Sequence, residues 1–189
     1  MIELSENGKK ALKQLFTDFL TNYNSNNIRE KIGLSNAGSL KLLRTMEQKN
    51  LLISKKMGKA IFYKPNLSSE YVLKLLELIL LDHSNLSNFV RGWVSELRTF
   101  AQMAKAIFLF GSVLKKGKEA GDVDVCFILK DAQDYPKIQT KIEELNKKNR
   151  LKIQPLYLTE KEFEERLRGE DPPLVDMVRN CVVIHGNEL

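Results

Sequence analysis

A run of apolar residues that ends in a Gly-Ser pair constrains the fold of this chain more than any other feature of its sequence. Residues 107–110 are all apolar, which predicts a buried strand, and Gly111 lets the backbone approach a ligand closely. Nine residues separate Ser112 from Asp122, where residues 121–125 predict a second strand. The sequence therefore predicts two strands joined through one glycine turn and a short connection.

Two aspartates lie on one face of the second predicted strand. Because side chains alternate along an extended chain, Asp122 and Asp124 are expected to project together, while Val123 and Val125 point into a core. Mg²⁺ prefers oxygen ligands and leaves positions for water and substrate phosphates. Paired carboxylates beside a Gly-Ser turn with N–H donors and a hydroxyl therefore suit a magnesium-nucleotide.

The pair Gly111-Ser112 followed by Asp122-Val123-Asp124 resembles the signature of the DNA polymerase beta nucleotidyltransferase superfamily, in particular its minimal nucleotidyltransferase group. The resemblance covers residues 101–189. It implies that Asp122 and Asp124 bind Mg²⁺ (or Mn²⁺) and that ATP or another nucleoside triphosphate is the substrate or ligand. The residues then expected at the nucleotide are Gly111, Ser112, Lys115 and Lys116. The alternative for the two aspartates is that they cap a hairpin at the surface without a ligand. The alternative for the lysines is a solvated loop.

The resemblance also implies a third catalytic carboxylate on a later strand. Residues 151–158 predict that strand, and its central candidate is Gln154, which is neutral and a poor base. Metal-nucleotide binding is therefore expected, and transfer activity is left open. Asp131, Asp134 or Glu160 would take the third position only if the strand aligns differently.

Three helical patterns open the chain. The first, residues 6–20, is expected to bury Leu12, Leu15, Phe16, Phe19 and Leu20. A short helix, residues 28–32, ends at Gly33, and a third helix spans residues 36–49. The third helix is expected to face the core with Ala37, Leu40, Leu43 and Met46.

The outer side of the third helix carries side chains that can bond to base edges and phosphates. These are Asn36, Ser39, Lys41, Arg44, Thr45 and Gln48. Two short strands, residues 51–56 and 60–64, follow and predict a hairpin with a lysine-rich tip. The lysines expected to contact DNA there are Lys55, Lys56 and Lys59.

Helix, short helix, turn, longer helix and basic hairpin resemble the winged helix-turn-helix of bacterial and archaeal regulators, over residues 5–66. The resemblance implies that the third helix enters the major groove of double-stranded DNA and that the hairpin lies along the backbone or minor groove. Use of the same fold for protein contacts is the alternative. Residues 1–67 hold twelve Lys or Arg against five Asp or Glu, while residues 68–189 hold 18 against 19. This asymmetry favours a polyanion partner for the N-terminal part.

Two further helices, residues 70–81 and 86–100, connect the two parts. The second is expected to turn Phe89, Val90, Trp93, Val94 and Leu97 inward. The first has little polar surface, which predicts cover by either domain or by a second subunit in a homodimer. The chain shows no signal-peptide pattern and no apolar run long enough to span a bilayer, so we expect a cytoplasmic protein without membrane contact. Cys126 and Cys181 are expected to be reduced and buried.

These patterns predict an α/β (α+β) chain with a winged helix-turn-helix (1–67), connecting helices (68–100) and a nucleotidyltransferase-like mixed sheet flanked by helices (101–189). The predicted function is a DNA-binding regulator whose C-terminal domain binds a magnesium-nucleotide. The alternative is an active nucleotidyltransferase that moves AMP or another nucleoside monophosphate onto a protein or small-molecule hydroxyl. One form of this alternative is the antitoxin of a toxin-antitoxin pair, which would modify its partner toxin as the protein acceptor.

Overall fold

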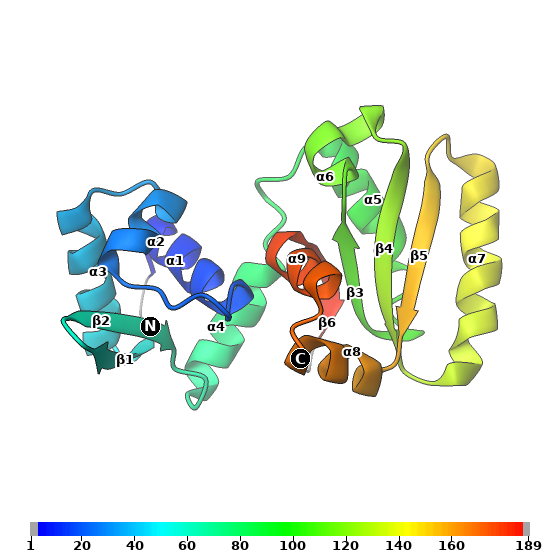
Figure 1. Ribbon diagram of the computed structural model, residues 1–189. Coiled ribbons are helices and arrows are strands. Elements are labelled where there is room, and N and C mark those ends of the chain that lie inside the picture. The colour runs from blue at the N-terminus through cyan, green and yellow to red at the C-terminus, as the bar shows by residue number, and fades with distance from the viewer. Residues whose placement is uncertain (1–3, 187–189) are drawn as a thin grey trace. The chain divides into compact units, whose positions relative to one another are not determined.

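The computed structural model describes residues 4–186 and divides into two compact units, Met1–Leu80 and Leu81–Leu189 (Figure 1). Each unit has its own hydrophobic core. The predicted α+β architecture is confirmed, with helices, one two-stranded sheet and one four-stranded mixed sheet. Among the described residues, none of the helices has the length and apolar character needed to cross a bilayer.

The first unit is a three-helix cluster followed by a hairpin and one more helix. Its elements are α1 (Glu6–Thr17), α2 (Ser25–Ile32), α3 (Asn36–Gln48), β1 (Leu52–Met57), β2 (Ala60–Pro65) and α4 (Glu70–Leu80). β1 and β2 pair in antiparallel register from Leu52 opposite Pro65 to Met57 opposite Ala60. Tyr23, between α1 and α2, forms an isolated bridge to Tyr63 of β2. That bridge fixes the hairpin to the helical cluster.

Local signals in the sequence fix the ends of these helices. Asn24 caps α2 in a capping box with Asn27, so α2 begins three residues earlier than the pattern predicted. Gly33, with φ of +71°, ends α2 in the left-handed conformation that glycine tolerates best. Ser35 then accepts a hydrogen bond from the Gly38 N–H and starts α3.

The core of the first unit gathers one face of each helix. Its fully enclosed side chains include Leu12, Ile28, Leu43, Met46, Leu51 and Val72. Leu20 is exposed, contrary to the prediction, because α1 ends at Thr17 and no longer carries it inward. Tyr71 and Leu78 of α4 are exposed too.

The second unit is built on a four-stranded sheet with strand order β5-β4-β3-β6. Its elements are α5 (Asn88–Arg98), β3 (Ala104–Phe110), α6 (Val113–Lys116), the 3₁₀ turn η1 (Gly117–Glu119), β4 (Asp122–Leu129), the 3₁₀ turn η2 (Ala132–Asp134), α7 (Tyr135–Lys148), β5 (Lys152–Leu158), α8 (Glu160–Arg168), α9 (Pro172–Asn180) and β6 (Val182–Gly186). β3 pairs antiparallel with β4 and β6, and β4 runs parallel to β5. Pro155 lies in the edge strand β5, where a missing N–H costs no sheet hydrogen bond.

Helices cover both faces of this sheet (Figure 1). Val90, Trp93 and Leu97 of α5 and Ile138 of α7 share one core with the side chains that point to their face of the sheet, such as Val123. On the opposite face Phe163 of α8 stacks on Phe108 of β3, with ring centroids 5.8 Å apart. The sheet is therefore buried on both sides along most of its length.

The two helices between the predicted domains belong to different units. α4 packs into the first core through Val72, Leu76 and Ile79, whereas α5 packs into the second core. Phe89 is 37% exposed, so its predicted inward position is wrong. It lies one residue before the buried stripe that begins at Val90, and its ring stays at the surface of α5.

Candidate functional site

Asp122 and Asp124 begin β4, and both side chains are half-buried, whereas Val123 and Val125 are fully enclosed. The predicted alternation is therefore present. Val123 and Val125 belong to the core under α5 and α7, so the aspartates project from the opposite face of the sheet. Phe110 of β3 is directly opposite Asp124 in the register.

Gln154 lies beside Asp124 in the sheet. The parallel register of β4 and β5 aligns Asp122 with Lys152 and Asp124 with Gln154. Aligned residues of neighbouring strands share a face, so residue 154 stands next to the carboxylate pair. The ammonium of Lys152 donates instead to the carbonyl oxygens of Asn146 and Asn149.

The other acidic candidates for a third catalytic position lie elsewhere. Asp131 and Asp134 follow the C-terminal end of β4, and Glu160 follows the C-terminal end of β5. Asp122 and Asp124 are at the N-terminal end of β4, so these three acids stand at the other end of the sheet. Asp134 pairs with Lys137, and Glu160 pairs with Lys105. Within residues 4–186 no three His, Cys, Asp or Glu side chains gather closely enough to hold a metal ion.

Gly111 lies against the carboxylate of Asp124. It has φ of +79°, a left-handed conformation that favours glycine. A Cβ built on Gly111 would stand 2.0 Å from Oδ2 of Asp124 and 2.9 Å from its Cγ. Both halves of the sequence signature are thus in direct contact.

The surroundings of Asp124 favour its protonated form. Burial raises the pKa of Asp124 above its usual value, and the charge of Asp122 raises it further. Two ionised carboxylates on one strand face repel each other. A bound cation would favour their charged form.

The segment after Gly111 forms a single helical turn. Ser112 precedes α6, and its side chain makes no capping hydrogen bond. Lys115 and Lys116 lie in α6 and are exposed. The segment between Ser112 and Asp122 is therefore a short helical turn followed directly by η1.

Cys126 lies on the aspartate side of β4 and is fully enclosed. Burial raises the pKa of its thiol to about 12, with a further contribution from Cys181. A thiol in that state is a packing group. Cys181 is partly exposed, which departs from its predicted burial.

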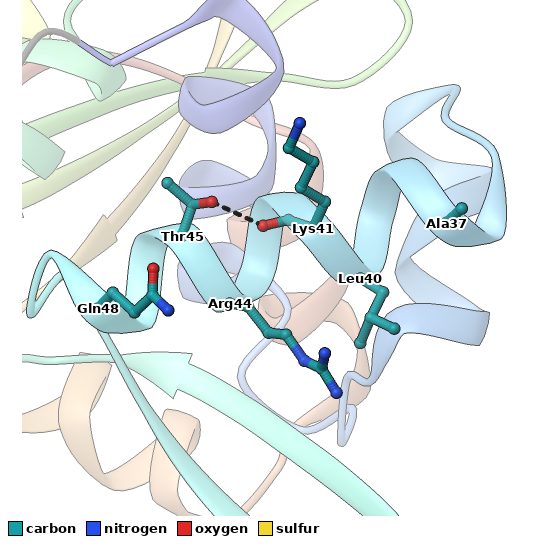
Figure 2. Close-up of a pocket in the computed structure, with 6 residues that line it drawn as sticks. All are labelled: Ala37, Leu40, Lys41, Arg44, Thr45 and Gln48. Carbon is teal, nitrogen blue, oxygen red and sulfur yellow. Dashed lines mark hydrogen bonds between the residues drawn. The ribbon is translucent and has the colours of Figure 1, made fainter.

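The exposed face of α3 forms a shallow concavity with a volume of about 360 Å³ (Figure 2). Its lining residues are Ala37, Leu40, Lys41, Arg44, Thr45 and Gln48. Figure 2 shows the long side chains of Lys41 and Arg44 extending from the helix. The Thr45 hydroxyl donates to the carbonyl of Lys41 at 2.8 Å.

Ala37 and Leu40 belong to this outer face, contrary to the predicted core position, and only Leu43 and Met46 of that set are enclosed. The sequence spacing could have indicated this, because Ala37, Leu40 and Arg44 are three and four residues apart and so lie on one face of the helix. Small apolar groups on such a face can contact the methyl group of thymine.

Ser39 does not lie on the outer face, so that prediction is wrong. Its side chain is fully enclosed, and its hydroxyl lies 2.7 Å from the Ser25 carbonyl oxygen and 3.0 Å from that of Asn36. It joins the start of α2 to α3. The remaining predicted residue, Asn36, is exposed at the first turn of α3.

The hairpin carries the predicted lysines at its far end. Lys55 and Lys56 of β1 and Lys59 of the turn are exposed. Gly58, with φ of +61°, closes the turn. None of the three lysines forms an ion pair with the part of the chain that the structure describes.

No family model matches this sequence, and no curated protein matches it. Solved structures of two point mutants of Lactococcus lactis ZitR show a distant likeness. The mutant in which a cysteine is replaced by serine has a TM-score of 0.36 and 13% identity, over 52% of this chain and 73% of that chain. The mutant in which a glutamate is replaced by alanine has a TM-score of 0.36 and 15% identity, over 52% of this chain and 62% of that chain. At this degree of similarity the function has to be argued from the residues themselves.

Proposed function

We propose that this protein is a DNA-binding regulator whose second unit binds a nucleoside triphosphate with Mg²⁺ at Asp122 and Asp124. One observation carries the nucleotide site: Asp124 stands between Gly111 on one neighbouring segment and Gln154 on the adjacent strand. A glycine turn, two carboxylates and an amide therefore meet at one end of one sheet face.

The donor set fits Mg²⁺ that arrives with a nucleotide. Mg²⁺ in phosphate-transfer sites is held by one or two carboxylates, while water and substrate phosphates supply the other ligands. Asp122 and Asp124 supply that number, and the raised pKa of Asp124 supports a site that gains from a cation. When bound, the ion neutralises phosphate charge. The role of the chain is to hold its position.

Gln154 makes binding better supported than transfer. It lies where the resemblance to nucleotidyltransferases implies a carboxylate, and its amide oxygen can contact an ion but cannot accept a proton at neutral pH. An active transfer of AMP or another nucleoside monophosphate to a protein or small-molecule hydroxyl is the second candidate. The intact aspartate pair favours it. An antitoxin that modifies its partner toxin is one form of this second candidate.

The DNA-binding part of the proposal rests on the exposed face of α3 and the hairpin lysines. Lys41, Arg44 and Gln48 combine charge with hydrogen-bonding groups, which suits contacts to phosphates and base edges. Lys55, Lys56 and Lys59 suit the backbone beside the groove.

Calorimetric titration tests the nucleotide site. We expect ATP, or another triphosphate, to bind the wild type only when Mg²⁺ is present, and the variant Asp122→Asn to lose that binding. Lys130→Gln, which removes an exposed charge beyond the far end of β4, is the matched control and is expected to bind normally. Equal affinity in wild type and Asp122→Asn would reject the site.

A salt titration of duplex binding tests the regulator function. Affinity for DNA is expected to fall steeply with salt concentration, because counterions are released from each contacted phosphate. A protein with no salt-sensitive duplex binding would not be a DNA-binding regulator.

A further inference from the structure

A second pocket, with a volume of about 430 Å³, lies on the surface of the second unit beside α5. Its lining includes Asn88, Phe89, Gly92, Trp93, Lys118 and Arg150. Trp93 shares its core with Val123 and Val125, which point away from the aspartate face of β4. The pocket is therefore on the other face of the sheet from Asp122 and Asp124.

Gly92 leaves bare backbone on the exposed side of α5. It stands exposed in the middle of α5, where glycine is a poor helix former. A Cβ built on Gly92 would meet no atom within 4 Å. Gly92 is one of the residues that line the pocket, so bare helix backbone faces its interior.

An exposed aromatic side chain borders this bare stretch. Phe89 lies one helical turn before Gly92, and its ring is 37% exposed. Trp93 lies beside both and is mostly buried. The exposed edge of Phe89 is therefore the main apolar surface of the pocket, and a planar ring can stack on such an aromatic side chain.

Cationic and amide groups line the same pocket. Lys118 and Arg150 are exposed and form no ion pair with any described residue. Asn149 donates its amide N–H to Glu96 Oε2 at 2.9 Å, and Asn88 Oδ1 accepts from Arg91. The amide oxygen of Asn149 and the amide nitrogen of Asn88 make none of these bonds, so they can bond to a ligand. The Glu96 carboxylate already accepts the hydrogen bond from Asn149.

We propose that this pocket binds a nucleoside phosphate unit, either a free mononucleotide or one residue of a single strand. The base would stack on Phe89 over Gly92, the amides would bond to the base edge, and Lys118 and Arg150 would hold the phosphate. An acidic peptide would use the two cations but would gain nothing from a bare backbone beside an aromatic ring. The pocket has no pair of carboxylates, so its binding is independent of Mg²⁺.

Trp93 gives a direct readout because it is the only tryptophan of the chain and lines the pocket. The test is titration of the full chain with AMP and with oligo(dA) in buffer containing EDTA, followed by tryptophan fluorescence. Saturable quenching by at least one is expected. Quenching by AMP identifies a free nucleotide as sufficient, and quenching by oligo(dA) alone identifies a single strand. No quenching by either, or quenching only by a polyglutamate peptide, would overturn the proposal.

Two variants localise the signal. Gly92→Leu fills the pocket without straining the helix and is expected to weaken binding at least about tenfold, whereas Gly92→Ala keeps it. Arg150→Gln is expected to weaken binding about tenfold, because a charge-assisted hydrogen bond is lost. Lys147→Gln, an exposed charge on α7 outside the pocket lining, is the matched control.

The aspartate variant separates this site from the proposed nucleotide site. Asp122→Asn is expected to leave the EDTA-resistant quenching unchanged, whatever it does to Mg²⁺-dependent binding. Loss of the quenching in Asp122→Asn, or full quenching in Gly92→Leu, would place the ligand elsewhere and overturn the proposal.

Discussion

The carboxylate of Asp124 occupies the space that a side chain on residue 111 would need. A Cβ on Gly111 would stand 2.0 Å from Oδ2 of Asp124, far inside any permitted contact. The glycine was expected from the sequence to let a ligand approach the backbone. Its position shows a further requirement, because it makes room for one of the two aspartates.

Gly111→Ala is therefore expected to displace Asp124 and to abolish Mg²⁺-dependent nucleotide binding. The methyl group would collide with the carboxylate, and φ of +79° would strain any non-glycine residue by about 1 to 2 kcal/mol. Calorimetry of nucleotide binding and urea unfolding measure the two effects.

Gly121→Ala is the matched control, since a Cβ there would meet no atom within 4 Å and residue 121 directly precedes Asp122. It is expected to retain binding and stability. Normal nucleotide binding in Gly111→Ala would show that the position of Asp124 is unimportant.

Asp124→Asn is expected to stabilise the metal-free protein at neutral pH. The folded pKa of Asp124 is raised by burial and then by Asp122, so the native state binds more protons than the unfolded state and loses stability as pH rises through the interval between the two pKa values. The gain is less than about 1 kcal/mol, because the pair is partly solvated. Urea unfolding in EDTA at neutral and at acidic pH measures it.

The stability gain of Asp124→Asn is expected to disappear at a pH below both the folded and the unfolded pKa of Asp124, because the wild-type carboxyl is then protonated in both states. Mg²⁺ affinity of the wild type is expected to weaken as pH falls toward the raised pKa, since a protonated carboxyl is a poor ligand. A variant less stable than wild type in EDTA at neutral pH would contradict the charge repulsion.

Ser39→Ala is expected to destabilise the first unit rather than to remove a DNA contact. The enclosed hydroxyl bonds to the carbonyl of Ser25, and its loss removes this buried hydrogen bond between α2 and α3 at a cost of about 1 kcal/mol. Lys41→Ala, on the exposed face of α3, is the counterpart and is expected to weaken duplex binding with unchanged stability. Thermal unfolding and a DNA-binding titration of both variants distinguish a structural role of Ser39 from a DNA contact. An unchanged melting temperature in Ser39→Ala would contradict the structural role.

Features fixed by neighbours in sequence were predictable. The alternation at Asp122 and Asp124 and the turn at Gly33 both appear as the sequence indicates. Each depends on a few adjacent residues.

Features fixed by distant segments were not predictable in the same way. Ser39 is polar, yet the start of α2 covers it, and Phe89 is apolar, yet it remains 37% exposed beside Gly117 of η1. The contact of Gly111 with Asp124 depends on the antiparallel pairing of β3 and β4. Helical spacing says which residues share a face, but not where the neighbouring elements end.

The triple variant Lys55→Ala, Lys56→Ala, Lys59→Ala is expected to weaken duplex binding similarly for all sequences. Each lost phosphate contact lowers the slope of log affinity against log salt by about 0.9, so the slope is expected to flatten by about 2 to 3. The matched control replaces Lys10, Lys31 and Lys74, which are exposed on other elements of the same unit, and removes the same charge. If both triple variants flatten the slope equally, the loss of affinity reflects net charge alone, and the hairpin lysines do not contact the DNA specifically.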